Sequence, residues 1–109
     1  MSVRLATGVW VDAYRAQLSA AHIPCYITAR GDAVAGAVVV KCAHLDGTAR
    51  AFQRSFDATG ARVWMVMCEG PEAEVDAQLS RARQYDPDLW IIEIESREGI
   101  TLLGQGGLE

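Results

Sequence analysis

The carboxylates of the segment Asp86–Glu95 are the residues whose types and spacing come closest to an active site. They surround an apolar run, and side chains of a β-strand alternate between its faces, so Glu93 and Glu95 would share one face. Two carboxylates placed in this way could bind a divalent cation or take part in acid–base catalysis. No histidine or third carboxylate is spaced to complete either site, so we predict a strand whose far end emerges into solvent beside basic neighbours. The candidate binding residues of this segment are Asp86, Asp88, Glu93 and Glu95.

A second segment alternates arginine with aromatic residues. Two arginines alternate with two phenylalanines in 48–56, and an arginine and a tryptophan follow on the next predicted strand. Arginines between aromatic side chains on a sheet are typical of proteins that bind single-stranded RNA by stacking its bases on the aromatic rings. The glycine–aromatic signature of those proteins is absent. We therefore expect the two phenylalanines to lie in the core and no nucleic acid to bind. Weak binding of single-stranded RNA stays open as an alternative. The candidate binding residues here are Arg50, Arg54, Arg62 and Trp64.

A thiol and an imidazole lie two residues apart at Cys42 and His44 and are followed by Asp46. Nucleophilic catalysis would need the thiol beside a base and a third group that orients the base. Residues two apart on a strand are separated by about 7 Å, which is too far for direct proton transfer. We therefore expect Cys42 to be a buried apolar residue, and we predict no catalytic residue.

The composition excludes several classes of protein. The chain has 109 residues, half of them apolar, and a net charge of −4, which argues against a general affinity for polyanions. Its three cysteines are widely spaced, which fits neither a disulfide framework nor a zinc site. No signal peptide or membrane-spanning run is recognisable. We therefore expect a cytoplasmic protein with no cofactor, no bound metal and no membrane partner.

The charges are unevenly distributed along the chain. Residues 1–68 carry seven basic and four acidic side chains, whereas residues 69–109 carry three basic and ten acidic ones. Such a division can indicate a partner of opposite charge. We favour the simpler interpretation that the two parts face each other within one fold, because surface charges mostly pair or face water.

The pattern of apolar residues predicts seven elements. Apolar side chains recur every three or four residues after Thr7, the expected N-cap, and again after Gly70-Pro71. The segments between are rich in strand formers and contain turns such as Asp46-Gly47, and Gly36 indicates a bulge or a close backbone approach. The predicted helices are 8–22 and 71–85, and the predicted strands are 25–29, 35–44, 48–56, 62–68 and 89–95.

This order, α-β-β-β-β-α-β, predicts an α+β fold. We expect an antiparallel sheet of about five strands, consisting of a four-strand meander and a C-terminal strand, packed with two helices. Residues 1–103 would form a single domain. Residues 104–109 are expected to be a flexible tail, and the final Leu108-Glu109 resembles a cloning scar.

Seven short segments carry a further signal that extends over nearly the whole chain. They are Arg4-Leu5, Gly8–Val11, Arg30-Gly31-Asp32, Ala35–Lys41, Leu45–Arg50, Tyr85–Glu95 and Arg97-Glu98-Gly99. Together they resemble a family of small bacterial proteins, domain-of-unknown-function family 1491, with Tyr85–Glu95 as the most specific part. The resemblance implies one intact domain. The family has no established activity, so the resemblance implies no catalytic or binding role.

These patterns favour a small, non-enzymatic protein-interaction module. It would present the basic or the acidic strand surface to an unidentified protein partner or to a second copy of itself. An enzyme with a cryptic carboxylate or Cys/His site stays open as an alternative, as does the weak single-stranded RNA binder.

Overall fold

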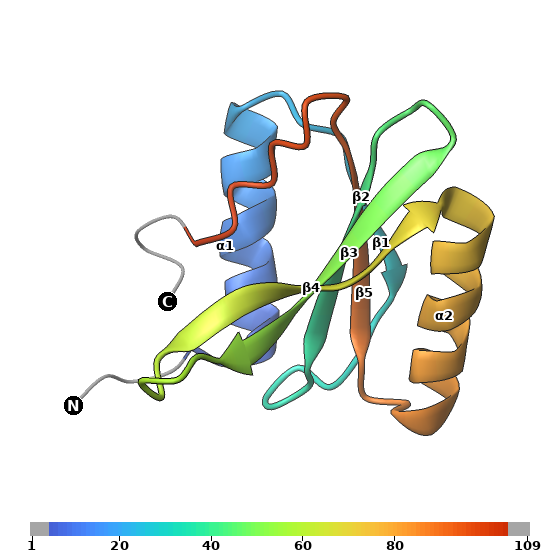
Figure 1. The fold of residues 1–109 in the computed structure, drawn as a ribbon. Coiled ribbons are helices and arrows are strands. Elements are labelled where there is room, and N and C mark those ends of the chain that lie inside the picture. The colour runs from blue at the N-terminus through green and yellow to red at the C-terminus, as the bar shows by residue number, and fades with distance from the viewer. Residues whose placement is uncertain (1–4, 105–109) are drawn as a thin grey trace.

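The computed structural model describes residues 5–104 and places them in two helices and one five-stranded sheet (Figure 1). The elements are α1 (Thr7–Ala20), β1 (Cys25–Ala29), β2 (Val38–Ala43), β3 (Thr48–Phe56), β4 (Arg62–Pro71), α2 (Glu72–Tyr85) and β5 (Trp90–Glu95). The α+β class and the order of elements along the chain are as predicted. Neither described helix is long and apolar enough to cross a membrane. Of the predicted tail, only Gly104 belongs to the described residues, and Leu108-Glu109 lies outside them.

The sheet is mixed, with the strand order β1-β5-β2-β3-β4. β5 lies between β1 and β2, antiparallel to β1 and parallel to β2. The predicted four-strand meander and purely antiparallel sheet are therefore wrong, and only β2, β3 and β4 follow one another as hairpins. The reason is burial, since all of β2 and four of the six residues of β5 are buried, whereas β1 alternates between half-buried and exposed residues. The two most apolar strands take central positions, and β1 is left at an edge.

The two helices cover opposite faces of the sheet, which gives three layers (Figure 1). Val40 of β2 packs with Trp10 and Tyr14 on the α1 side. Val39, the preceding residue, packs with Leu79 on the α2 side. Because successive residues of a strand point to opposite faces, the continuous apolar run of β2 is what a strand between two helices requires.

The segment Arg30–Ala37 holds the N-terminus of α1. The N–H groups of Thr7 and Gly8 donate to main-chain carbonyls of this segment at 3.2 and 2.8 Å. The Thr7 hydroxyl donates to the carbonyl oxygen of Gly36 at 2.7 Å. The N-cap is Ala6 rather than the predicted Thr7, because these carbonyls do the work of a capping side chain.

α1 is closed by a left-handed residue, His22, whose φ is 60°. The N–H groups of His22 and Ile23 donate to the carbonyls of Ser19 and Leu18, which is the closure that usually employs glycine. Because the left-handed conformation costs a residue with a Cβ about 1–2 kcal/mol, His22→Gly should raise the free energy of unfolding in urea by about 0.5–1 kcal/mol. His22→Ala is the control, since it removes the imidazole but keeps the Cβ and should bring no gain. An equal gain in both variants would contradict this explanation.

Candidate functional site

The carboxylates of the acidic segment do not form one surface. Glu93 contacts the Lys41 ammonium at 2.9 Å. Glu95 accepts a hydrogen bond from a tyrosine hydroxyl at 3.3 Å. Asp86 and Asp88 lie in the turn between α2 and β5, where the Asp86 carboxylate accepts the N–H of Asp88 at 3.0 Å. The residues predicted as one binding surface are thus divided among three local contacts.

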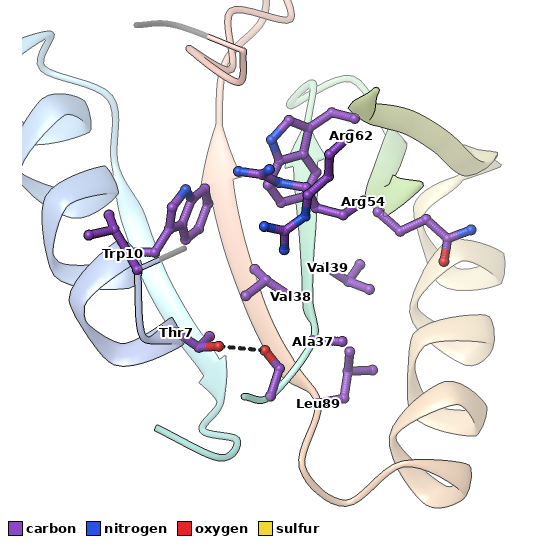
Figure 2. Close-up of a pocket in the computed structure, with 12 residues that line it drawn as sticks. Thr7, Trp10, Ala37, Val38, Val39, Arg54, Arg62 and Leu89 are labelled. Atoms are coloured by element: carbon purple, nitrogen blue, oxygen red, sulfur yellow. Dashed lines mark hydrogen bonds between the residues drawn. The ribbon is translucent and has the colours of Figure 1, made fainter. Parts of the chain in front are cut away.

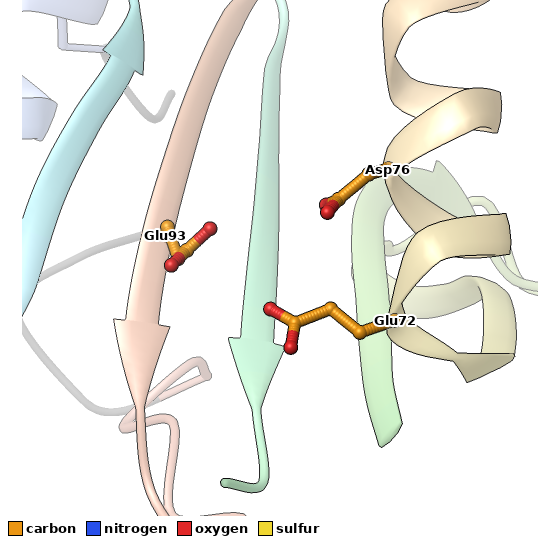
Figure 3. Close-up of side chains that lie close together, drawn as sticks. All are labelled: Glu72, Asp76 and Glu93. Carbon is orange, nitrogen blue, oxygen red and sulfur yellow. The ribbon is translucent and has the colours of Figure 1, made fainter. Parts of the chain in front are cut away.

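Lys41 is buried at the centre of three carboxylates. Its side chain is 4 % exposed, and its Nζ lies 2.7, 2.6 and 2.9 Å from carboxylate oxygens of Glu72, Asp76 and Glu93. Figure 3 shows these carboxylates converging from the start of α2 and from β5. Burial alone would lower the pKa of Lys41, but the hydrogen bonds with Asp76, Glu72 and Glu93 raise it above its ordinary value. Lys41 therefore stays an ammonium group and ties α2 to the sheet.

The three carboxylates by themselves resemble a metal site, because one ligand atom of each lies within 4.8 Å of the others. The ammonium group of Lys41 takes the place that a cation would occupy, and its three donors match the three carboxylates. We therefore assign the cluster a structural role. Sequence reasoning missed it, although a lysine inside a strand that is apolar on both faces is a recognisable signal.

Ion pairs connect the basic and acidic parts of the chain. All four salt bridges among the described residues join a basic residue of 1–68 to an acidic residue of 69–109. Three involve Lys41, and the fourth joins Arg50 to Glu69, its cross-strand neighbour on β4, at 2.6 Å. This pairing agrees with the interpretation that the two parts face each other. Arg50 is therefore paired with Glu69 and does not join the other predicted basic binding residues.

A pocket of about 150 Å³ opens between α1 and the β3–β4 hairpin (Figure 2). Three of the predicted binding residues, Arg54, Arg62 and Trp64, line it. Arg54 and Trp64 are direct partners across β3 and β4, so their side chains leave the sheet on the same face. Thr7 and Trp10 of α1 form the facing wall. Two of the twelve residues that line the pocket, Arg54 and Arg62, are charged, and none of the twelve carries a carboxylate.

Aromatic rings hold the arginine side of the pocket in place. The ring centroids of Trp10 and Trp64 are 5.4 Å apart, and Tyr14 stacks on Trp10 at 4.9 Å. The Arg54 guanidinium lies 4.8 Å from the Trp64 ring centroid and 5.9 Å from that of Trp10, which are cation–π distances. The apolar spacing of the predicted helix 8–22 places Trp10 in its apolar stripe and predicts no further role for this residue. No local signal distinguishes a tryptophan that also lines a pocket.

The pocket exists because β3 and β4 extend past the start of β2. The pairing of β2 with β3 ends at Val39 and Gln53, whereas the pairing of β3 with β4 continues to Phe56 and Arg62. The hairpin therefore projects beyond its neighbour (Figure 1), and residues of α1 line the pocket beside it. Phe56, expected in the core, is 58 % exposed at the end of this projection.

Cys42 and His44, the alternative catalytic pair, do not line this pocket. Cys42 is 1 % exposed, and its Sγ lies 3.8 Å from the Ser96 carbonyl oxygen. Burial raises the pKa of the Cys42 thiol. The Nδ1 atom of His44 lies 3.2 Å from the Thr48 hydroxyl. A buried thiol with a raised pKa is a poor nucleophile, so these contacts favour the packing role.

The buried thiols and phenol should make the fold sensitive to alkaline pH. Burial raises the pKa values of Cys25, Cys42, Cys68 and Tyr14 above their ordinary values. Acids with a raised pKa in the folded state resist ionisation there, so the unfolded state is favoured once the pH exceeds the ordinary pKa. The free energy of unfolding under reducing conditions should be level near pH 7 and fall above about pH 9. The fall should reach up to about 1.4 kcal/mol per pH unit for each of the buried groups Cys42 and Tyr14, and should be smaller for the half-buried Cys25 and Cys68, which water screens.

Urea denaturation at pH 7, 9 and 10 measures this alkaline loss. Cys42→Ala should be less stable than the wild type at pH 7 but should lose less between pH 9 and 10, because one of the ionising groups is gone. A wild-type stability that is constant or rises over this range would contradict the assignment.

Comparison with known proteins identifies the chain at the level of its family. The sequence model of a family described as "Protein of unknown function (DUF1491)" matches residues 5–104. The chain belongs to the DUF1491 family. The expectation from the sequence resemblance is therefore confirmed, and no curated protein matches the chain.

Solved structures of similar proteins share the fold. A crystal structure of a DUF1491 family protein from Caulobacter crescentus CB15 is 37 % identical, with a TM-score of 0.83 over 92 % of this chain and 95 % of that chain. An NMR structure of a DUF1491 family protein from the same organism is 36 % identical, with a TM-score of 0.80 over 94 % of this chain and 96 % of that chain. The solution structure of protein Atu0922 from A. tumefaciens is 27 % identical, with a TM-score of 0.76 over 93 % of each chain.

Two of the segments that carry the DUF1491 resemblance, Arg30-Gly31-Asp32 and Tyr85–Glu95, contact each other beside the pocket. We call this contact the joint. The Asp32 N–H donates to the Asp88 carbonyl at 3.0 Å, and the Trp90 indole N–H donates to the Asp32 carbonyl at 2.8 Å. A Cβ at Gly31 or Gly36 would overlap with the Asp88 carbonyl oxygen. The close backbone approach predicted at Gly36 is thus confirmed, although Gly36 precedes β2. The joint positions Gly36 in the pocket wall.

Proposed function

We propose that this DUF1491 protein is a non-enzymatic binding domain whose ligand occupies the pocket between α1 and the β3–β4 hairpin. One observation carries the proposal: the guanidinium groups of Arg54 and Arg62 and the indole rings of Trp10 and Trp64 line one hollow. A concave, largely apolar site with a few convergent polar groups is the usual form of a ligand site. The proposed ligand contacts are Trp10, Arg54, Arg62 and Trp64.

The ligand should combine a negative charge with an apolar group. A guanidinium group donates paired hydrogen bonds to a planar oxyanion, and the face of an indole ring favours an apolar or flat group. Among the lining residues there is no carboxylate, histidine, cysteine or lysine that could act as a general acid, a base or a nucleophile. This absence within the pocket supports binding rather than catalysis at this site.

The pocket is a more specific candidate than the charged strand surfaces. Arg50 and Glu93 are engaged with Glu69 and Lys41, which leaves those surfaces less charge to offer a partner. A protein partner stays compatible with the proposal if it presents an acidic and apolar group to the pocket. Trp64 is half-buried against the α1-side core, so the hairpin lacks the open stacking platform of a single-stranded RNA binder.

The proposal is tested by titration with 3-phenylpropionate, which carries one ring and one carboxylate, while the indole N–H signals of the tryptophans are followed by NMR. We expect saturable shifts for Trp10 and Trp64 with a dissociation constant of about 1 mM, a usual affinity for so few contacts. The uncharged 3-phenylpropanamide should bind about tenfold more weakly, because it gives the arginines no charge.

Matched variants locate the binding site in this titration. Arg62→Gln should weaken binding of the acid, whereas Arg50→Gln removes an equal charge outside the pocket and should leave binding unchanged. Equal affinity for the acid and the amide, or shifts confined to Trp90, would overturn the proposal.

A further inference from the structure

We propose that the pocket binds the free carboxyl terminus of an extended peptide whose last side chain is apolar. This inference rests on the proposed function and names the class of ligand. Three features carry it: the size of the pocket, the pairing of its charges with its rings, and the open edge of β3 beside it.

The pocket has room for one apolar side chain of a ligand. Its volume of about 150 Å³ lies well below the roughly 300 Å³ at which sites for drug-sized molecules begin. An apolar cavity of about 150 Å³ holds a single benzene ring. The side chain of one leucine or phenylalanine residue therefore fits the pocket.

The charges lie where a terminal carboxylate would meet them. Arg54 and Arg62 come from neighbouring strands of the hairpin, and Figure 2 shows both projecting into the space that faces α1. The donors of an arginine guanidinium group lie in one plane and match the planar geometry of a carboxylate. Trp10 and Trp64 lie beside the Arg54 guanidinium, so a carboxylate and an apolar side chain on the same residue can be bound together.

The main chain of β3 offers the third contact. Ser55 and Phe56 pair with β4 on one side, but the register of β2 ends at Gln53, so among the described strands no neighbour follows on the other side. In an antiparallel ladder alternate residues direct both N–H and C=O to the same side, so one residue of this pair addresses that open side. An extended peptide entering there would continue the sheet in the manner of strand addition. A small aromatic acid would fill the pocket without using this edge.

The test compares three ligands on the full chain: N-acetyl-Ala-Ala-Phe with a free carboxylate, the same peptide with a C-terminal amide, and 3-phenylpropionate. Affinities are measured from the indole signals, and hydrogen exchange of the Ser55 and Phe56 amides is measured with each ligand. We expect the peptide acid to bind about tenfold more tightly than 3-phenylpropionate and than the peptide amide. We also expect protection of one amide in 55–56 by the peptide acid alone.

The outcomes separate this inference from the proposed function. If 3-phenylpropionate binds as tightly as the peptide acid, or if the peptide protects no amide in 55–56, the peptide inference is overturned while the proposed function stands. If neither ligand shifts the Trp10 and Trp64 signals, both are overturned. Arg62→Gln should remove the preference for the acid over the amide, and Arg50→Gln should keep it.

Discussion

Gly31→Ala should lower the free energy of unfolding by about 3 kcal/mol or more, a large share of the stability of a small domain. A Cβ at this position would overlap with the main-chain carbonyl of Asp88 and with the indole of Trp90. Neither group can yield freely, because the Asp88 carbonyl accepts the Asp32 N–H and the Trp90 indole donates to the Asp32 carbonyl. Relief of the overlap would therefore break the joint and displace the segment Arg30–Ala37, which holds the N-terminus of α1. Urea denaturation followed by far-UV circular dichroism measures the loss.

Gly8→Ala is the matched control, because it adds the same methyl group where there is room. A Cβ at Gly8 would lie 3.4 Å from its nearest neighbour, the Ala33 carbonyl oxygen, and Gly8 lies inside α1. Alanine favours a helix over glycine by up to about 1 kcal/mol, so this variant should be at least as stable as the wild type. Equal losses in the two variants would show that the joint is not what holds the fold.

Lys41→Met should cost about 2–4 kcal/mol, because three carboxylates would face one another without a counter-charge. Removal of one partner from a buried ion pair typically costs about 3–5 kcal/mol. Here the side chains of Glu72, Asp76 and Glu93 are 37 %, 54 % and 27 % exposed, so water reduces the penalty. Urea denaturation at pH 7 and low salt measures the effect.

Removal of the surplus negative charge provides the control for Lys41→Met. In that background, Glu72→Gln together with Glu93→Gln should recover much of the lost stability, since a buried polar cluster replaced as a whole costs little. A loss below about 1 kcal/mol in Lys41→Met would mean that the ammonium group contributes only packing. A combined variant that recovers no stability would likewise mean that the ammonium group contributes only packing.

The strands could be located from the sequence, but their neighbours could not. The turn at Asp46-Gly47 and the alternation that follows it are local signals, and β3 begins and ends at the predicted residues. The position of β5 depends on a competition between whole strands for the centre of the sheet. An apolar run such as Ile91-Ile92 forms the same main-chain hydrogen bonds with a parallel or an antiparallel neighbour, so the sequence around it does not reveal its partner.

The candidate site was predictable to the extent that it lies on one hairpin. The alternation of Arg54 with its neighbours correctly places it on one face with Trp64. Trp10 joins them only because α1 packs across that face, and Arg50 leaves the group because Glu69 lies opposite it. Contacts between distant elements decide both outcomes, and local spacing carries no information about them.

The central position of β5 has a consequence for the order in which the protein is made. β1 and β2 both need β5 as their neighbour, yet β5 is the last strand along the described chain. During synthesis, β1 and the apolar strand β2 therefore keep unpaired edges until Trp90–Glu95 has left the ribosome. Pairings between such distant segments also slow folding, because long loops must close first. The nascent chain is thus most prone to aggregate just before its final strand arrives.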